Sequence, residues 1–245
     1  MYRKYLFFYL KTGGGHYAPA KAVARILEQD ENHPIDPVLA DGMDGAPLIL
    51  KKMVVDGYSF SQTRSTKSFE FLYALHKLLP FAKMSRAIVT KLITRAVTER
   101  IRNERPSVIV NFHFFLIEPI QKAVEKLKLN IPVITVVTDP YTAHPLWFLS
   151  KAQKMIVFSE QVKETAIKNG VDASSIRIFP FAIDEKFSTK LSTAEINQLR
   201  IKHQFSADKK IVLIMGGGDG LPGATKLLKR LAYHGSEADV ILVCG

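Results

Sequence analysis

The fold is decided by residues 5–29, which read YLFFYLKTGGGHYAPAKAVARILEQ. The six apolar residues at its start form a run too short to cross a membrane, and such a run is typical of a strand buried on both faces of a parallel sheet. Three glycines follow, and apolar residues then recur at helical spacing over 18–29. A strand, a tight glycine turn and a helix in this order predict the opening of a doubly wound α/β sheet.

The same alternation of strand and helix continues along the chain. Short apolar, β-branched runs predict further strands at 107–111, 132–138, 154–158, 176–179, 211–215 and 239–244. Helical patterns between them predict helices at 69–79, 86–103, 116–127, 160–169, 194–203 and 223–233. The fold class is therefore α/β, with a doubly wound, Rossmann-like parallel sheet followed by the start of a second Rossmann-like domain.

A polar stretch between residues 181 and 210 interrupts this pattern. It predicts an N-terminal domain at 1–185, an interdomain linker at 186–209 and the beginning of a second domain at 210–245. Within the linker, Ser192 and Glu195 have the spacing of a capping box. One βαβ unit cannot bury both faces of its sheet, so we expect the native protein to continue beyond Gly245. The alternative is that the last unit packs onto the first domain.

Positive charge is concentrated in one part of the chain. The net charge is +11, and residues 51–105 hold twelve lysines and arginines against four acidic residues. This predicts a polyanionic partner, and anionic membrane lipid is favoured over nucleic acid because long apolar side chains are interspersed with the cations. A merely solvated surface is the alternative. No stretch approaches about 20 apolar residues, and one cysteine allows no internal disulfide, so we expect a cytoplasmic protein that contacts membranes peripherally.

His16 ends the first glycine turn. The turn lacks the spacing of a dinucleotide-binding fingerprint and the Lys-Ser/Thr of a P-loop, which argues against hydride transfer and ATP hydrolysis. Because it lies between a strand and a helix, it should face the crevice at the carboxyl ends of the strands. A neutral imidazole there can take a proton from an attacking hydroxyl. The alternative is a histidine that only caps the helix.

A second motif, TDPYTAHPLW at 138–147, follows another predicted strand and should reach the same crevice. Asp139 is expected to orient His16 and to raise its basicity, and the alternative is a simple turn before Pro140. His144 and Trp147 are expected to line the acceptor entrance, with the indole stacked on a sugar or placed at a lipid interface; core packing of Trp147 is the alternative. The histidines that follow strands lack the close spacing of a metal site, so no metal is expected.

Taken together, these residues resemble the diacylglycerol glycosyltransferases of the monogalactosyldiacylglycerol synthase and processive glucosyltransferase family. The resemblance is carried by the turn from Gly13 to His16, by Thr138 and Asp139 with the residues downstream, and by IVLIMGGGDG at 211–220. It implies two Rossmann-like domains that face each other across a cleft. The N-terminal domain would bind a lipid acceptor, and the C-terminal domain would bind a UDP-sugar.

The resemblance also assigns roles to residues. His16 would be the general base, supported by Asp139. The residues implied on the acceptor side are Gly14, Gly15, Tyr17, His144 and Trp147. The residues implied beside the donor pyrophosphate are Gly216, Gly217 and Gly218, although this glycine loop can also be only a tight turn.

We therefore expect an inverting hexosyltransferase that moves a hexose from UDP-hexose to diacylglycerol in glycolipid synthesis, with UDP-sugar as co-substrate and no further cofactor. One alternative is an N-acetylglucosaminyltransferase acting on the undecaprenyl-linked peptidoglycan precursor. Another is a non-catalytic module that binds anionic lipid. Most donor contacts of the family lie beyond the point corresponding to Gly245, so the chain by itself is not expected to catalyse the reaction.

Overall fold

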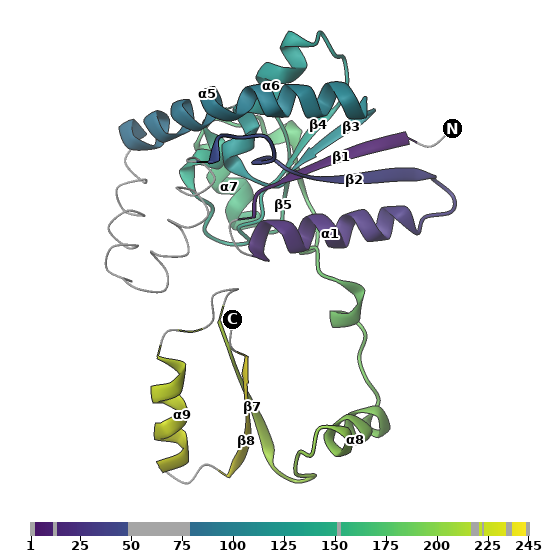
Figure 1. Cartoon of the computed structure of the whole chain (residues 1–245), viewed down its shortest axis with the longest axis vertical. Helices are drawn as coiled ribbons and strands as arrows, with labels where there is room; N and C mark the ends of the chain where they lie inside the picture. Colours follow the sequence, from purple (N-terminus) through teal and green to yellow (C-terminus); the bar gives the residue numbers. More distant parts are fainter. Residues whose placement is uncertain are drawn as a thin grey trace.

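A computed structural model describes residues 3–11, 14–48, 79–150, 153–216, 221, 223–233 and 237–243. Six of its strands form one sheet in the order β2-β1-β3-β4-β5-β6, and every neighbouring pair is parallel (Figure 1). Their bounds are β1 Arg3–Tyr9, β2 Ile35–Asp41, β3 Val108–Asn111, β4 Val133–Val136, β5 Lys154–Val157 and β6 Ile176–Ile178. This sheet confirms the predicted α/β class.

Strand β2 was not predicted from the sequence. Its residues include Asp36 and Pro37, which are rare in strands. Proline cannot donate a hydrogen bond to a neighbouring strand and is tolerated at the edge of a sheet. Among the described strands, β2 lies at one edge of the sheet and pairs with β1 alone, which accommodates Pro37.

Helices cover both faces of the six-stranded sheet. Helix α1 (Gly14–Glu28) lies on one face, where Phe7 and Tyr9 of β1 belong to the same buried cluster as Ala20. Helices α5 (Leu79–Glu104) and α6 (Ile117–Lys126) lie on the other face (Figure 1), where Leu6 and Phe8 are buried. The continuous apolar run of β1 follows from this, because successive side chains enter opposite cores.

Shorter elements complete this part of the chain. Helix α7 (Glu160–Lys168) follows β5 and buries Val162 and Ala166 in a cluster with Met155 and Trp147. Four 3₁₀ turns lie between the main elements of the described chain: η2 Phe114–Leu116, η3 Pro145–Phe148, η4 Ala173–Ser175 and η5 Glu185–Phe187. Two of these turns, η2 and η3, follow β3 and β4, and they place the aromatic side chains of the site described below.

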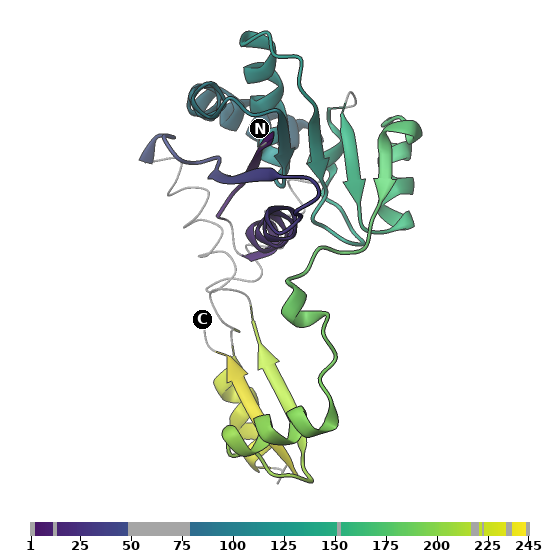
Figure 2. The same ribbon diagram turned by 90° about the vertical axis from the view of Figure 1, so that its right-hand side faces the viewer.

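A second, two-stranded parallel sheet is formed by β7 (Lys210–Met215) and β8 (Ala238–Val243), with α9 (Ala224–Tyr233) between them in sequence. It is preceded by α8 (Thr193–Lys202), whose capping box of Ser192 and Glu195 confirms the predicted cap. Figures 1 and 2 show these elements grouped apart from the six-stranded sheet. The domain boundaries at 185 and 209 remain predictions.

Two sequence-based predictions fall wholly or partly outside the described residues. The predicted helix at 69–79 reaches them only at Leu79. Five of the twelve cations in the basic segment 51–105 precede α5 and are not described, and the other seven lie at 79–105. The predicted helix at 86–103 corresponds to α5, which begins seven residues earlier, at Leu79. None of the described helices is both long and apolar enough to span a membrane.

Candidate active site

The polar residues of the two sequence motifs meet at one edge of the sheet. His16 lies in the first turn of α1, just beyond β1, while Phe112 follows β3 and Thr138 follows β4. Strands β1, β3 and β4 are neighbours and run parallel, so their carboxyl ends open at the same edge. The structure therefore joins residues 96 and 122 positions apart in the sequence.

Two hydrogen bonds hold the ring of His16 by the same nitrogen. Its Nδ1 lies 2.9 Å from the carbonyl oxygen of Phe112 and 2.7 Å from Oγ1 of Thr138. A carbonyl oxygen can only accept, so Nδ1 carries a proton and donates to it. The Thr138 hydroxyl oxygen then accepts from the same N–H, in a three-centre arrangement. In a neutral ring this leaves Nε2 with its lone pair, so Nε2 is the atom that can take up a proton.

The surroundings of His16 keep the ring neutral. Burial lowers the pKa of His16 below its ordinary value, and this effect outweighs the carboxylate of Asp139 and the carbonyl of Phe112, which both raise it. At neutral pH the imidazole is therefore uncharged. An uncharged imidazole with a bare Nε2 has the protonation state that a general base requires.

Asp139 affects His16 mainly through its charge. Its Oδ2 accepts hydrogen bonds from the indole N–H of Trp147 at 2.8 Å and from the backbone N–H of His144 at 3.1 Å. The hydrogen bonds that hold the His16 ring come instead from Phe112 and Thr138. Orientation of His16, which the sequence assigned to Asp139, thus falls to these two partners, whereas a charge effect of Asp139 on basicity is present.

Trp147 lies close to His16, and His144 packs nearby on Phe114. Trp147 is completely buried, and its ring centroid lies 6.2 Å from that of His16. The prediction that its indole stacks on a sugar or faces lipid is wrong for this structure, because Asp139 satisfies the N–H and the ring packs in the core. His144 is also buried; its Nδ1 accepts from the N–H of Leu146, and its ring stacks on Phe114. An acceptor-side role of His144 remains a prediction.

Open space lies in front of the first turn of α1. Gly14 and Gly15 are exposed, and a Cβ atom added to either would have no atom within 4 Å among those compared. Backbone N–H groups at the start of a helix attract an anion or a polar oxygen. Tyr17 is half-buried, and its ring packs on Tyr9 with centroids 4.8 Å apart. The glycines therefore face solvent beside His16, and Tyr17 braces the end of β1.

The donor-side prediction is only partly within the described residues. Gly216 directly follows β7 and is half-buried, whereas Gly217 and Gly218 lie outside the described residues. A donor-binding role for this loop remains a prediction.

His113 is a functional candidate that sequence reasoning considered only as a metal ligand. It is buried, its Nδ1 accepts from the N–H of Phe115, and its ring centroid is 4.3 Å from that of His16. Burial, with smaller contributions from the charges of His16 and His144, holds the pKa of His113 well below its ordinary value. His113 lies two residues after the end of β3, as Thr138 does after β4. This position beyond a strand end is the feature of the sequence that could have identified His113. No group of three potential ligands suited to a metal occurs among the described residues.

Comparison with known proteins places the chain in a family. The family described as monogalactosyldiacylglycerol (MGDG) synthase matches residues 16–183, which are more than half of the chain. The chain belongs to the MGDG synthase family. The matched range holds His16, His113 and Thr138, so the site described above falls within the part that defines MGDG synthase relatives.

Curated relatives in the family are distant and longer. Processive diacylglycerol beta-glucosyltransferase of Bacillus licheniformis is 27% identical over 175 residues, which cover 71% of this chain and 44% of that protein. Monogalactosyldiacylglycerol synthase 2, chloroplastic, of Arabidopsis thaliana is 23% identical over 258 residues, covering 96% of this chain and 51% of that protein. The chain thus spans about half the length of the curated relatives it matches.

Solved structures support the fold. The UDP-GlcNAc 2-epimerase from Methanocaldococcus jannaschii matches with a TM-score of 0.53 and 12% identity, covering 100% of this chain and 74% of that one. The UDP-GlcNAc 2-epimerase from Neisseria meningitidis matches with a TM-score of 0.51 and 12% identity, covering 100% and 66%. At this identity the likeness concerns the Rossmann-like fold alone.

Proposed function

We propose that this chain is the acceptor-side part of an inverting glycosyltransferase that moves a hexose from UDP-hexose to diacylglycerol. Membership of the MGDG synthase family and the activities for which the two relatives are named support this assignment. The single observation that carries the proposed chemistry is the neutral His16, whose Nδ1–H is held by Phe112 and whose Nε2 is left to act as a base.

In the proposed reaction the acceptor hydroxyl lies beside Nε2 of His16. Its oxygen attacks the anomeric carbon while its proton passes to Nε2, and the bond from that carbon to the phosphate oxygen breaks. UDP leaves with the electron pair, so the anomeric configuration inverts in one displacement. The carboxylate of Asp139 lowers the cost of the imidazolium that forms, because opposite charges attract across the buried site. The chain uses no further cofactor in this scheme.

The proposed acceptor is dissolved in a membrane, so a site beside His16 must approach one. We assign peripheral binding of anionic lipid at the cytoplasmic face to the basic segment 51–105, which carries most of the net charge. The described part of this segment is α5, where Lys91 and Arg102 are exposed. Gly14 and Gly15 are proposed to let the acceptor's polar end approach the backbone closely.

His16→Ala in the full-length protein tests the role of the base. Turnover of UDP-glucose or UDP-galactose with diacylglycerol should fall by about 10²- to 10⁴-fold, since general-base catalysis contributes this much. Donor affinity should stay unchanged, which separates lost chemistry from lost folding. Unchanged turnover would remove His16 from the mechanism. Transfer to an undecaprenyl-linked acceptor in place of diacylglycerol would keep the base but contradict the proposed substrate.

A further inference from the structure

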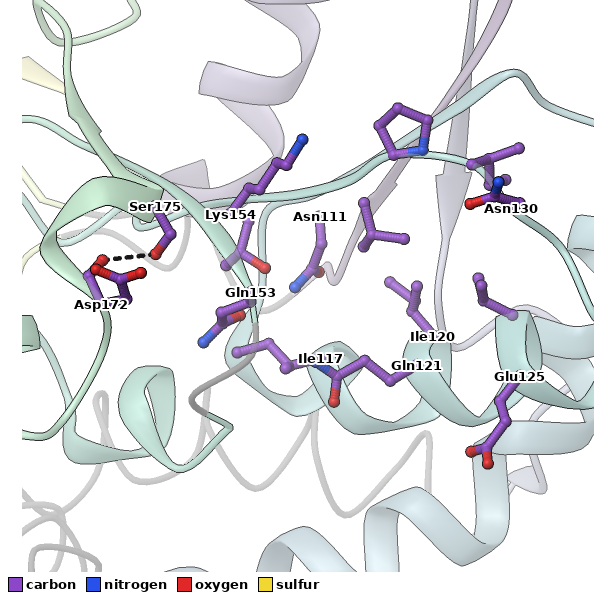
Figure 3. A pocket seen from close by; sticks show the side chains of 15 residues that line it. Asn111, Ile117, Ile120, Gln121, Glu125, Asn130, Gln153, Lys154, Asp172 and Ser175 are labelled. Carbon is purple, nitrogen blue, oxygen red and sulfur yellow. Dashed lines mark hydrogen bonds between the residues drawn. The ribbon is translucent and has the colours of Figure 1, made fainter.

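A cavity of about 750 Å³ opens on the face of the six-stranded sheet that α5 and α6 cover (Figure 3). It lies between α6 and the edges of β3, β4 and β5, and its lining includes none of the residues assigned to the candidate active site. The described part of the connection from β4 to β5 forms only the short turn η3. A longer crossover helix would cover the sheet at this point, so the short turn leaves room for the cavity.

Most of the wall is apolar. Ile117, Ile120 and Val124 of α6 face the cavity from one side, and Ile131 and Val133 line it near the start of β4. The rim carries one lysine and two acidic residues, Lys154, Glu125 and Asp172, all of them exposed. Such a wall favours an apolar molecule, and the mixed rim does not select strongly for either sign of charge.

Asn111 presents an unused hydrogen-bond donor to this cavity. The residue is completely buried, and its Oδ1 accepts from the backbone N–H of His113 at 3.1 Å. That bond fixes the orientation of the amide, because a backbone N–H cannot donate to an NH₂ group. The Nδ2 of Asn111 then has no hydrogen-bond partner among the residues that the structure describes. Buried donors are nearly always satisfied by protein, ordered water or ligand, so this one is open to a partner from outside the chain.

Gln153 presents an unused acceptor to the same cavity. Its Nε2 donates to the carbonyl oxygens of Trp147 at 2.9 Å and Ser150 at 2.7 Å, which fixes the orientation of this amide too. Its Oε1 is buried, and no described residue forms a hydrogen bond with it. Asn111 and Gln153 both line the cavity, as does Ile117, the first residue of α6 (Figure 3). One donor and one acceptor are thus offered together within an apolar wall.

We propose that this cavity is a second binding site, for a neutral molecule with an apolar body and one amide or hydroxyl group. The ligand oxygen accepts from Nδ2 of Asn111, and the ligand N–H or O–H donates to Oε1 of Gln153. A carboxylate would place its charge against the Gln153 oxygen, and an ammonium group would meet the Asn111 donor. Either charge would also lose its hydration in an apolar site. The site does not depend on the proposed transfer reaction.

Octanamide is a suitable probe, because it has an apolar chain and a primary amide. Titration into the 245-residue chain, followed by isoleucine methyl NMR, should give saturable shifts at Ile117, Ile120 and Ile131. Methyl octanoate accepts but cannot donate, so it should bind roughly three- to tenfold more weakly, as expected for one neutral hydrogen bond. Equal affinity for the two probes would overturn the role of the amide pair, and no saturable shift at these methyls would overturn the site.

A variant that fills the cavity tests whether the probe binds there. Val124→Trp places a large ring in the cavity and should abolish the octanamide shifts, whereas Lys126→Trp, on an exposed position of the same helix, should leave them unchanged. Retention of binding by Val124→Trp, with its fold confirmed by the methyl spectrum outside the cavity, would contradict the assignment. If Val124→Trp does not fold, the comparison of the two probes on the unsubstituted chain still decides the proposal.

Discussion

A single carbonyl group decides which nitrogen of His16 can work as a base. The Phe112 oxygen keeps the proton on Nδ1, and the Thr138 hydroxyl shares that proton, so Nε2 is free to react. Burial lowers the pKa enough to keep the ring uncharged at neutral pH. In the proposed reaction, these contacts let His16 act as a base without a carboxylate in hydrogen-bonding contact.

Replacing Thr138 by valine tests the shared proton. Thr138→Val keeps the shape of the side chain but removes one acceptor from Nδ1–H, so the ring should be held less firmly. Turnover of the full-length protein should fall by roughly three- to tenfold, in line with one neutral hydrogen bond. Thr142→Val, on an exposed position of the same loop, is the matched control. Identical turnover of the two variants would show that the Thr138 hydroxyl plays no part.

Asp139→Asn separates charge from hydrogen bonding. An asparagine oxygen can still accept from Trp147 and from the His144 backbone, so the fold should be retained. The negative charge that raises the pKa of His16 is lost, so that pKa should fall further. We expect lower turnover and a shift of the acid limb of the pH–rate profile towards lower pH. An unmoved acid limb would mean that the Asp139 charge does not reach the base.

His113 makes the stability of the fold depend on pH. Its pKa in the folded state lies well below the ordinary value, so between that value and about pH 6.5 the unfolded chain binds more protons. Stability should therefore fall as the pH drops below about 6.5. His113→Asn keeps an acceptor for Phe115 N–H and should reduce the slope by up to about 1.4 kcal/mol per pH unit. Urea unfolding at several pH values measures this, and parallel curves for the two proteins would refute it.

The sequence predicts which residues lie close together more reliably than it predicts the contacts that each side chain makes. Convergence of His16 with the 138–147 motif followed from parallel strand ends alone. Burial of Trp147 did not, because an indole is equally suited to a core, a sugar or a lipid interface, and only the position of Asp139 decides between them. The proton partner of His16 was also out of reach, since it is a backbone carbonyl that any residue at position 112 would supply.

At the scale of elements, the start of α1 differs from the sequence-based expectation. The helix was predicted over 18–29 with Pro19 near its first turn, yet it begins at Gly14 and contains Pro19. Glycine and proline both indicate a loop in a sequence, and proline removes one helical hydrogen bond. The early start matters, because it places His16 within the first helical turn, where the ring is held against β3 and β4.

Gly42 lies in the turn after β2 and is the most tightly packed of the five glycines whose surroundings were compared. A Cβ atom on Gly42 would collide with the side chain of Leu116 and press on Leu10. Gly42→Ala should therefore lower the free energy of unfolding by about 1–3 kcal/mol, the usual cost of overpacking. Gly14→Ala is the matched control, because a Cβ there meets open space. Thermal or urea unfolding compares the two, and equal stability would contradict the packing described.

In the whole molecule, the proposed base-side residues lie at the six-stranded sheet, whereas Gly216, proposed on the donor side, follows β7 of the second sheet. The family match ends at residue 183, before this second sheet. Apolar runs predicted the strands of both sheets, but the runs are buried on two faces only in the six-stranded sheet, whereas β7 is exposed at five of its six residues. The apolar pattern did not reveal β2, whose proline and aspartates are tolerated only because the strand lies at an edge.

The proposed membrane binding depends on where the positive charges lie in the whole molecule. Lys91 and Arg102 lie eleven positions apart on α5, about three helical turns, and both are exposed. Neutralising both to glutamine should weaken binding to phosphatidylglycerol vesicles roughly 30-fold, at about 1 kcal/mol for each cation. Lys202→Gln with Lys209→Gln, which removes the same charge near the second sheet, should have little effect. Vesicle flotation measures both pairs, and equal losses would indicate attraction by net charge alone.

The protonation state of His16 is the claim on which the proposed chemistry depends, and nitrogen-15 NMR of the histidine rings reads it directly. At pH 7 the spectrum of the 245-residue chain should show His16 as a neutral ring with a protonated Nδ1 and a bare Nε2, and His16→Ala should remove this signal. A protonated Nε2, whether in the other neutral tautomer or in a charged ring, would leave the site without a base and would contradict the account.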